Sequence, residues 1–238
     1  MAAVALTGAG NVTSATVTSG TSLVVNKPGN VADGDYFVAL IHYSISAGTM
    51  STPSGWTQQQ GENTSRSFYV FTKPIPVASS ESATDYTWNM TGGAGRLCGL
   101  ITRVTGAHAS TPLDANGTAT TTGVGSTVAP SITAVGTDCL LLGFYFTCDS
   151  SVTSVITQPG AMSSVATVTV APAATSTILI AQEQLSSSGA TGTRTASNAP
   201  GASSGVGGML MTILPALVVK PPVASVFPSL AASQAAIW

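Results

Sequence analysis

The stretch that decides the fold, SGWT…TPLD (54–114), contains three strand-like runs: RSFYVFTK (66–73), DYTWNM (85–90) and RLCGLITRV (96–104). Each run is rich in β-branched or aromatic residues and is bounded by Gly, Pro, Ser or Asn. This alternation between strand formers and turn formers is typical of a β-sheet. The stretch therefore predicts three strands of one sheet.

The same pattern continues on both sides. Residues 1–26 indicate two short strands at a sheet edge. The run Tyr36 to Ile45 is apolar on both faces over its first half, as in a covered central strand. A second buried strand is predicted in TDCLLLGFYFTC (137–148), where Leu140, Leu142, Phe144 and Phe146 share one face and Leu141 and Tyr145 share the other.

Further strands are expected at 152–157, 164–170, 176–183, 192–196 and 208–214. This spacing is typical of β-sandwiches and jelly rolls. We therefore predict an all-β fold over residues 1–217, an antiparallel two-sheet jelly-roll-like sandwich. One core shared by the two sheets should contain six large residues: Trp56, Phe71, Trp88, Leu100, Leu142 and Phe144.

Residues 218–238 have a different character, because Pro221, Pro222 and Pro228 oppose regular sheet pairing. We predict an extended, proline-containing C-terminal docking arm that ends in a short helix capped by Ser229. Its partner-binding residues would be Phe227, Leu230, Ile237 and Trp238. The alternative is that this segment folds back on its own domain.

Charged residues make up only 7% of the 238-residue chain, and mean hydropathy is +0.38. A surface covered by Ser, Thr, Gly and Ala offers little charge repulsion, which favours a homo-oligomer or a larger assembly. An ordinary Thr-rich sandwich is the alternative. The net charge of −2, with scattered basic residues, argues against nucleic acid as a partner.

The N-terminus MAAVALTGAG has no basic segment before its apolar residues, which argues against a secretory signal and for synthesis in the cytoplasm. The longest apolar run, Val206 to Val219, is shorter than the ~20 residues of a membrane helix and contains Pro215. We predict no membrane span.

Candidate metal and cofactor sites are weak. Cys98, Cys139 and Cys148 form no CxxC motif and are expected to be buried free thiols. Asp33 and Asp35 flank Gly34, where a tight turn is favoured over a calcium site. His42 lies in a strand and is expected in the core. We therefore expect no metal and no cofactor.

A catalytic centre is also not expected. His108, Ser110 and Asp114 fall in one short loop, but catalytic triads are assembled from separate elements of a fold. The sequence therefore predicts that the protein is not an enzyme.

Four aromatic residues, Trp56, Tyr69, Tyr86 and Trp88, suggest a surface on which sugar rings stack. Packing in the core is the alternative, and we favour it.

The order of several motifs resembles a known family. These motifs include SLVVNKPGNVADGDYFVALI (22–41), PSGWT (53–57), GLITRVTGAHASTPLDANG (99–117) and QPGAM (158–162). Over residues 10–216 the chain resembles a jelly-roll-like β-sandwich domain of tailed-bacteriophage virion structural proteins, of the minor tail, fibre or head-decoration type. The proline-rich segment after Leu217 departs from the usual pattern.

This resemblance implies a module on the virion surface, a decoration or fibre subunit that binds neighbouring capsid or tail subunits. It carries over no catalytic residues. The alternative is a carbohydrate-binding module that recognises host surface glycans, which rests on the aromatic residues and on fold analogy.

Overall fold

The computed structural model describes residues 4–6, 11–45, 48–63, 66–123, 125–149, 155–171, 175–199 and 205–216. Within these ranges every strand pair is antiparallel, and the single helical element is the 3-10 turn η1 (Ala78–Ser80). The predicted all-β fold is confirmed. The predicted boundary at 217/218 lies outside the described residues.

Two large sheets form the centre of the molecule. The first has the strand order β1 (Val12–Gly20), β7 (Gly95–Val104), β3 (Asp35–Tyr43), β5 (Ser67–Ile75) and β4 (Thr57–Asn63). The second has the order β14 (Ser163–Val170), β15 (Thr175–Gln184), β12 (Leu140–Asp149), β18 (Gly205–Ile213) and β8 (Leu113–Asn116), and β9 (Thr120–Thr122) also pairs with β18.

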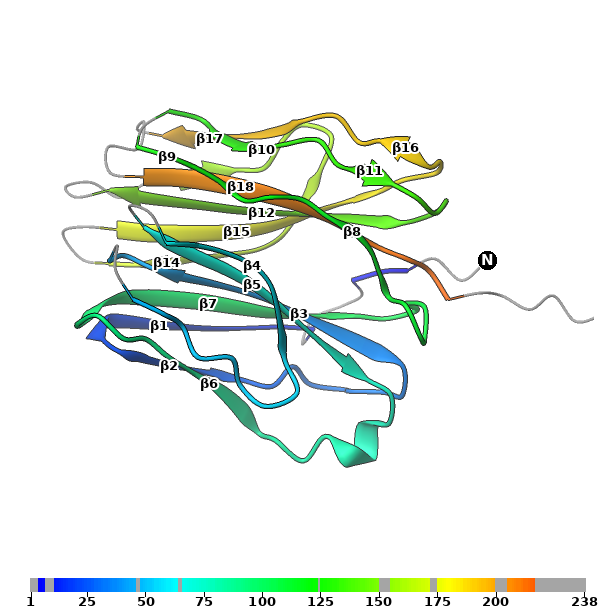
Figure 1. The fold of residues 1–238 in the computed structure, drawn as a ribbon, viewed down its shortest axis with the longest axis horizontal. Coiled ribbons are helices and arrows are strands. Elements are labelled where there is room, and N and C mark those ends of the chain that lie inside the picture. The colour runs from blue at the N-terminus through cyan, green and yellow to red at the C-terminus, as the bar shows by residue number, and fades with distance from the viewer. Residues whose placement is uncertain are drawn as a thin grey trace, which may run out of the picture.

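Small sheets cover the outer faces of both large sheets (Figure 1). On the first sheet lies the pair β2 (Ser22–Asn26) and β6 (Asp85–Asn89). On the second lie β10 (Thr127–Ala129), β17 (Arg194–Ala199) and β13 (Val155–Thr157), with the pair β11 (Thr133–Ala134) and β16 (Gly189–Ala190) beside them. The sandwich therefore has four layers rather than the predicted two.

The layers enclose three separate cores. The inner core, between the large sheets, includes Val38, Leu40, Leu142 and Phe144. The aromatic outer core, between the first large sheet and β2–β6, contains Phe37, Trp56, Tyr69, Phe71, Tyr86 and Trp88. The aliphatic outer core, under β10–β17–β13, contains Leu141, Tyr145, Met162, Leu179, Ala181 and Ala196. A strand such as β3 is buried on both faces because it contributes alternate residues to two cores.

Two details of the prediction are corrected. All six predicted core residues are buried, but they are divided between two cores, because Trp56, Phe71 and Trp88 lie on the outer side of the first large sheet. The run 85–90 is also not in the same sheet as the other two runs. It forms β6, which pairs with β2.

The two large sheets repeat one topology. The order β1-β7-β3-β5-β4 has its counterpart in β8-β18-β12-β15-β14, and the small pair β2–β6 has its counterpart in β10–β17. Registers agree as well: Leu40 pairs with Leu100 and Val70, and its counterpart Phe144 pairs with Met209 and Ile180. We call residues 11–104 the N-half and residues 113–213 the C-half.

Irregular features repeat too. The ladder between β4 and β5 shifts register between Gln58 and Gln60, and the ladder between β14 and β15 shifts between their counterparts Ser164 and Ala166. A turn precedes each of these strands, in which Trp56 donates to the carbonyl of Pro53 and Met162 donates to that of Pro159. Matching bulges and turns at matching places show that the halves are two versions of one unit.

An approximate two-fold axis relates the halves. His42 on β3 and Phe146 on β12 are counterparts, and their rings stack on each other with centroids 4.7 Å apart. Two equivalent residues meet in this way only close to a two-fold axis. The axis therefore passes through the inner core between these rings.

Candidate interaction surface

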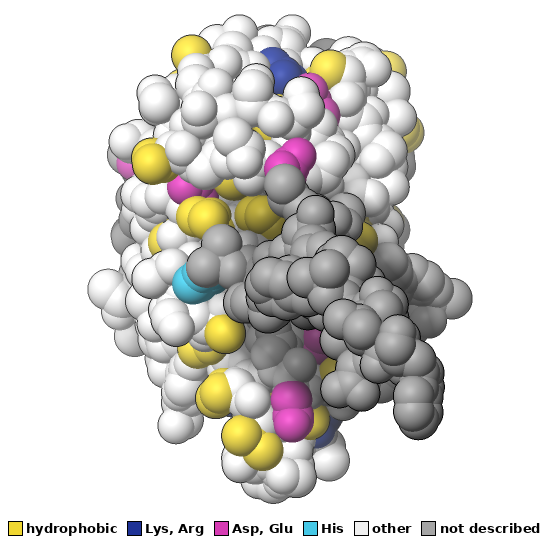
Figure 2. Space-filling model, turned by 90° about the vertical axis from the view of Figure 1, so that its right-hand side faces the viewer, with side chains coloured by type: hydrophobic (Ala, Val, Ile, Leu, Met, Phe, Trp, Pro, Cys, Tyr) yellow, Lys and Arg dark blue, Asp and Glu magenta, His cyan; other side chains and the backbone are white. Residues whose placement is uncertain are grey.

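Three chain segments meet at one end of the sandwich. The leader, Val4–Leu6, pairs with the end of β7 through Ala5 and Thr105. The connector between the halves, residues 105–112, pairs with the exit, residues 214–216: the amide of His108 donates to the carbonyl of Leu214, and the amide of Ala216 donates to that of Gly106. Figure 2 shows this end, where a histidine side chain (cyan) lies beside apolar side chains (yellow).

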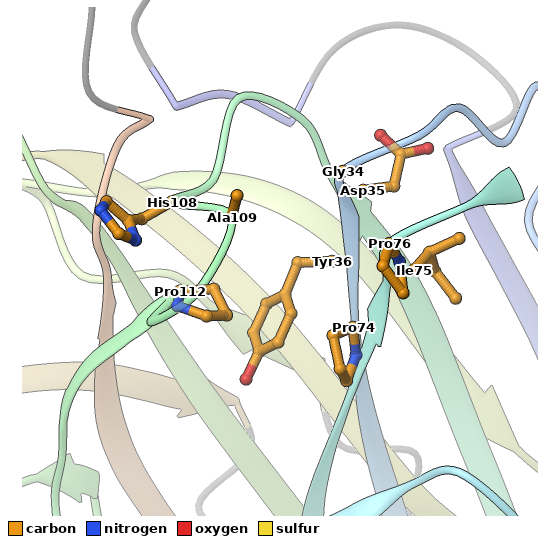
Figure 3. Close-up of a pocket in the computed structure, with 9 residues that line it drawn as sticks. All are labelled: Gly34, Asp35, Tyr36, Pro74, Ile75, Pro76, His108, Ala109 and Pro112. Carbon is orange, nitrogen blue, oxygen red and sulfur yellow. The ribbon is translucent and has the colours of Figure 1, made fainter.

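A small pocket opens at this end of the N-half (Figure 3). It is lined by Gly34, Asp35, Tyr36, Pro74, Ile75, Pro76, His108, Ala109 and Pro112. The Tyr36 ring lies between the connector residues and the prolines at the end of β5. The pocket has a volume of about 20 Å³, which holds about one water molecule. It is therefore too small for a larger ligand.

The C-half has a corresponding groove of about 270 Å³, lined by Val4, Ala5, Leu6, Leu140, Ser163, Gln182, Glu183 and Gln184. Leu140 is the counterpart of Tyr36. The connector therefore covers the end of the N-half, whereas the leader covers the end of the C-half. Sequence reasoning missed this exchange, because it joins segments that are far apart in the chain.

The carboxylates of Asp33 and Asp35 accept hydrogen bonds within the fold. The Asp33 carboxylate accepts from the amide of Ala78, at 2.7 Å. The Asp35 carboxylate accepts from the amide of Ala32 at 2.6 Å and from Arg103 Nε at 2.5 Å. The part of the chain that the structure describes contains no group of three potential metal ligands, and this pair supports the turn interpretation.

His108, Ser110 and Asp114 do not form a hydrogen-bonded triad in the described structure. His108 Nδ1 accepts from the amides of Ser110 and Thr111. The Asp114 carboxylate instead accepts from the amides of Val135 and Gly136 at 3.0 and 3.1 Å, and from Thr212 Oγ1 at 3.0 Å. Asp114 therefore links β8 to β18 and to the segment between β11 and β12.

The four residues considered for glycan stacking are buried. Trp56, Tyr69 and Tyr86 are 6%, 5% and 4% exposed, and Trp88 is fully buried. The Trp56 ring packs edge-on against both Tyr86 and Trp88, at 5.1 and 5.4 Å between centroids. These side chains form the aromatic outer core, as the alternative interpretation predicted, and offer no exposed aromatic face for a sugar.

A shallow groove of about 500 Å³ runs beside this core, lined by Pro53, Ser54, Lys73, Ser80, Glu81, Ser82, Ala83, Asp85, Tyr86 and Thr87. Its two central charges neutralise each other, because Lys73 Nζ lies 2.7 Å from Glu81 Oε2. Lys73 also lies over the Tyr86 ring, 4.9 Å from its centroid. This pair adds no net charge to the groove, and Asp85 is a further acidic residue in its lining.

Several titratable groups are buried inside the sandwich. His42 is fully buried, its Nδ1 bonds to the carbonyl of Ser67 at 2.9 Å, and Nε2 has no partner. Burial lowers the pKa of His42 to about 3, so the ring is neutral at pH 7. Cys98, Cys139 and Cys148 are free and buried, which confirms the prediction, and burial raises the pKa of the Cys139 thiol to about 11.

The predicted partner-binding residues Phe227, Leu230, Ile237 and Trp238 lie outside the described residues. In the described part of the chain, no helix has the length and apolar character to cross a membrane. Comparison of the chain with protein-family models, curated proteins and solved structures found no match. The resemblance to phage virion domains stays a prediction.

Proposed function

We propose that the chain is a structural subunit of a tailed-bacteriophage virion, a surface decoration or fibre protein that binds neighbouring capsid or tail subunits. The observation that carries this proposal is the end where leader, connector and exit meet. The last described residue, Ala216, is hydrogen-bonded there to Gly106. The described fold therefore ends beside the connector, at this end of the sandwich.

The composition supports an assembly role. Of the nine acidic residues, Asp33, Asp35, Glu81, Asp114 and Glu183 serve structural contacts within the sandwich. Few charges are left to keep copies apart, which suits a protein packed among other subunits. On this proposal the protein is made in the host cytoplasm and ends on the virion surface.

The continuing segment has the reach and the residues of a docking arm. The 21 residues of segment 218–238 span up to about 70 Å when extended. Phe227, Leu230, Ile237 and Trp238 are apolar and would be unfavourable in water, so we assign them to a groove on another subunit. The aromatic residues of the body are buried, which leaves glycan binding without an exposed aromatic platform.

Deletion of residues 218–238 tests the proposal. The truncated protein should keep its thermal midpoint, because the described cores end at Ile213, and should no longer sediment with phage particles. A full-length variant with Phe227, Leu230, Ile237 and Trp238 changed to Ser controls for chain length and should behave like the deletion. Normal incorporation of both variants, or unfolding of the truncated body, would contradict the proposal.

A further inference from the structure

The two faces that meet in the inner core are built from equivalent positions. Val38, Leu40 and Val70 of the N-half correspond to Leu142, Phe144 and Ile180 of the C-half, and all six are buried at 0% exposure. Each half thus presents the same pattern of apolar residues on strands of the same order and register. A face that fits its own equivalent is self-complementary.

Contacts across the core follow the two-fold axis. His42 stacks on its own counterpart Phe146, and Phe68 of the N-half lies 5.2 Å from the same ring. Away from the axis, the side-chain amide of Asn116 on β8 donates to the carbonyl of Gln59 on β4. This bond joins the edge strand β8 of the C-half to the edge strand β4 of the N-half. The pairing of the halves therefore has the geometry of a homodimer within one chain.

We propose that the inner face of the C-half is a homodimer interface whose second partner is the C-half of another copy of this chain. In the intact molecule the N-half covers this face, and the connector holds it there. When the connector no longer tethers the halves, two C-halves pair through the same strands, with Phe146 facing Phe146 on the axis. This inference does not depend on the role in a virion.

The residues on the two-fold axis differ between a homodimer of C-halves and a homodimer of N-halves. In a C-half pair the axis is occupied by two apolar rings. In an N-half pair the axis would hold two His42 rings, whose Nε2 atoms already lack a partner in the present structure. Two buried polar atoms without hydrogen bonds are unfavourable. The C-half pair is therefore more stable than the N-half pair.

A cleavable connector tests this in the full-length chain. Ala109, Ser110 and Thr111 are exposed, so a protease recognition sequence can be inserted in place of Ser110. The cut protein is unfolded in denaturant, refolded and weighed by native mass spectrometry. We expect the original pair together with C-half pairs, and fewer N-half pairs. Refolding to the original pair alone, without C-half pairs, would overturn the proposal.

Two variants sharpen the test. His42→Phe gives the N-half the axis residue of the C-half and should raise the ratio of N-half pairs to C-half pairs by about tenfold. His108→Phe, in the connector and away from the axis, should leave that ratio unchanged. An unchanged ratio in His42→Phe would contradict the role of the axis.

Co-expression covers the case in which the cut halves aggregate on refolding. The N-half and the C-half are produced together as separate chains. The C-half is present in two versions, each with a different tag. Capture of one tagged C-half should recover the other. Recovery of the N-half alone would overturn the proposal.

Discussion

The two halves of the molecule share one backbone plan but fill their outer cores differently. In the N-half, Trp56, Phe71 and Trp88 form a large aromatic cluster, whereas their counterparts Met162, Ala181 and Ala196 leave the outer core of the C-half aliphatic. The strand order and the bulges are nevertheless the same. Strand alternation and turn positions therefore determine this fold, and the volume of an outer core varies within it.

A compensating change keeps the aliphatic outer core filled. Ile41 of the N-half has Tyr145 as its counterpart, and Ala39 has Gly143. A Cβ at Gly143 would lie 2.7 Å from the Tyr145 ring, so the missing methyl group makes room for that ring. The Tyr145 hydroxyl reaches Met162 Sδ at 3.5 Å. One ring from β12 thus replaces part of the volume of the tryptophans.

The largest expected effect breaks the aromatic core. Trp88→Ala removes a fully buried indole and should lower the free energy of unfolding by about 3–5 kcal/mol. The matched change in the C-half, Ala196→Gly, removes only a methyl group from a strand and should cost about 0.5–1 kcal/mol. Urea titration followed by circular dichroism measures both. Equal losses would contradict the difference between the two outer cores.

The next effect tests what the halves share. Leu142→Ala leaves a cavity in the inner core and should destabilise the protein by about 2–5 kcal/mol. Trp56 and Trp88 lie only in the N-half, so tryptophan fluorescence in a Trp238→Phe background reports that half. Because both halves line the inner core, the fluorescence midpoint should shift together with circular dichroism. A shift in circular dichroism alone would show that the halves unfold separately.

The two residues on the axis predict a pH dependence. His42 has a pKa of about 3 when folded and about 6.5 when unfolded, so between these values the unfolded chain binds the extra proton. Above pH 6.5 the ionisation of His42 does not lower the free energy of unfolding. Between pH 6.5 and about pH 3, this free energy falls by about 1.4 kcal/mol for each pH unit of acidification.

The variant His42→Phe, which copies Phe146, should remove this part of the slope between pH 6.5 and 4. Phe146→His places a second imidazole on the axis and should steepen it. Urea midpoints measured across this range give the slopes. An unaltered slope in His42→Phe would contradict the assignment of this pH dependence to His42.

The smallest expected effect concerns two ion pairs, one in each half, whose members on β5 and β15 are counterparts of opposite charge. Lys73 pairs with Glu81 in the N-half, while its counterpart Glu183 pairs with Arg194 in the C-half. Arg194 binds in two places, with Nε and Nη2 at 2.8 and 3.0 Å from the carboxylate oxygens. Double-mutant cycles should give a coupling of about 0.5–1 kcal/mol for each pair, larger for the two-point contact. A larger coupling for Lys73 would reverse this comparison.

Much of the fold could be predicted from alternation in the sequence. The faces of residues 140–146 are as predicted: Leu142 and Phe144 point into the inner core, and Leu141 and Tyr145 point away from it. The doubly covered strand near residue 40 is confirmed as β3. Alternation shows that a strand has a buried face, but it does not show which sheet covers that face. The four layers and the separate cores were therefore missed.

The repeat was missed because it is carried by register and turns rather than by identical side chains. The one readable signal is the pair PSGWT (53–57) and QPGAM (158–162), which form the equivalent turns at Pro53 and Pro159. The end surface was beyond sequence reasoning for a similar reason. Its pocket combines residues near 35, 75 and 110, which only the folded sheets bring together.

A circular permutant tests most directly the claim that the chain is two equivalent halves around one inner core. Ala5 pairs with Thr105 and Ala216 bonds to Gly106, so both ends of the described body lie beside neighbouring residues of the connector. A chain that runs from residue 108 to 216, then through a short Gly-Ser linker into residues 4–107, should give the same circular dichroism spectrum and a thermal midpoint within a few degrees of the parent. A permutant that does not fold, or that unfolds in two separate transitions, would contradict the claim.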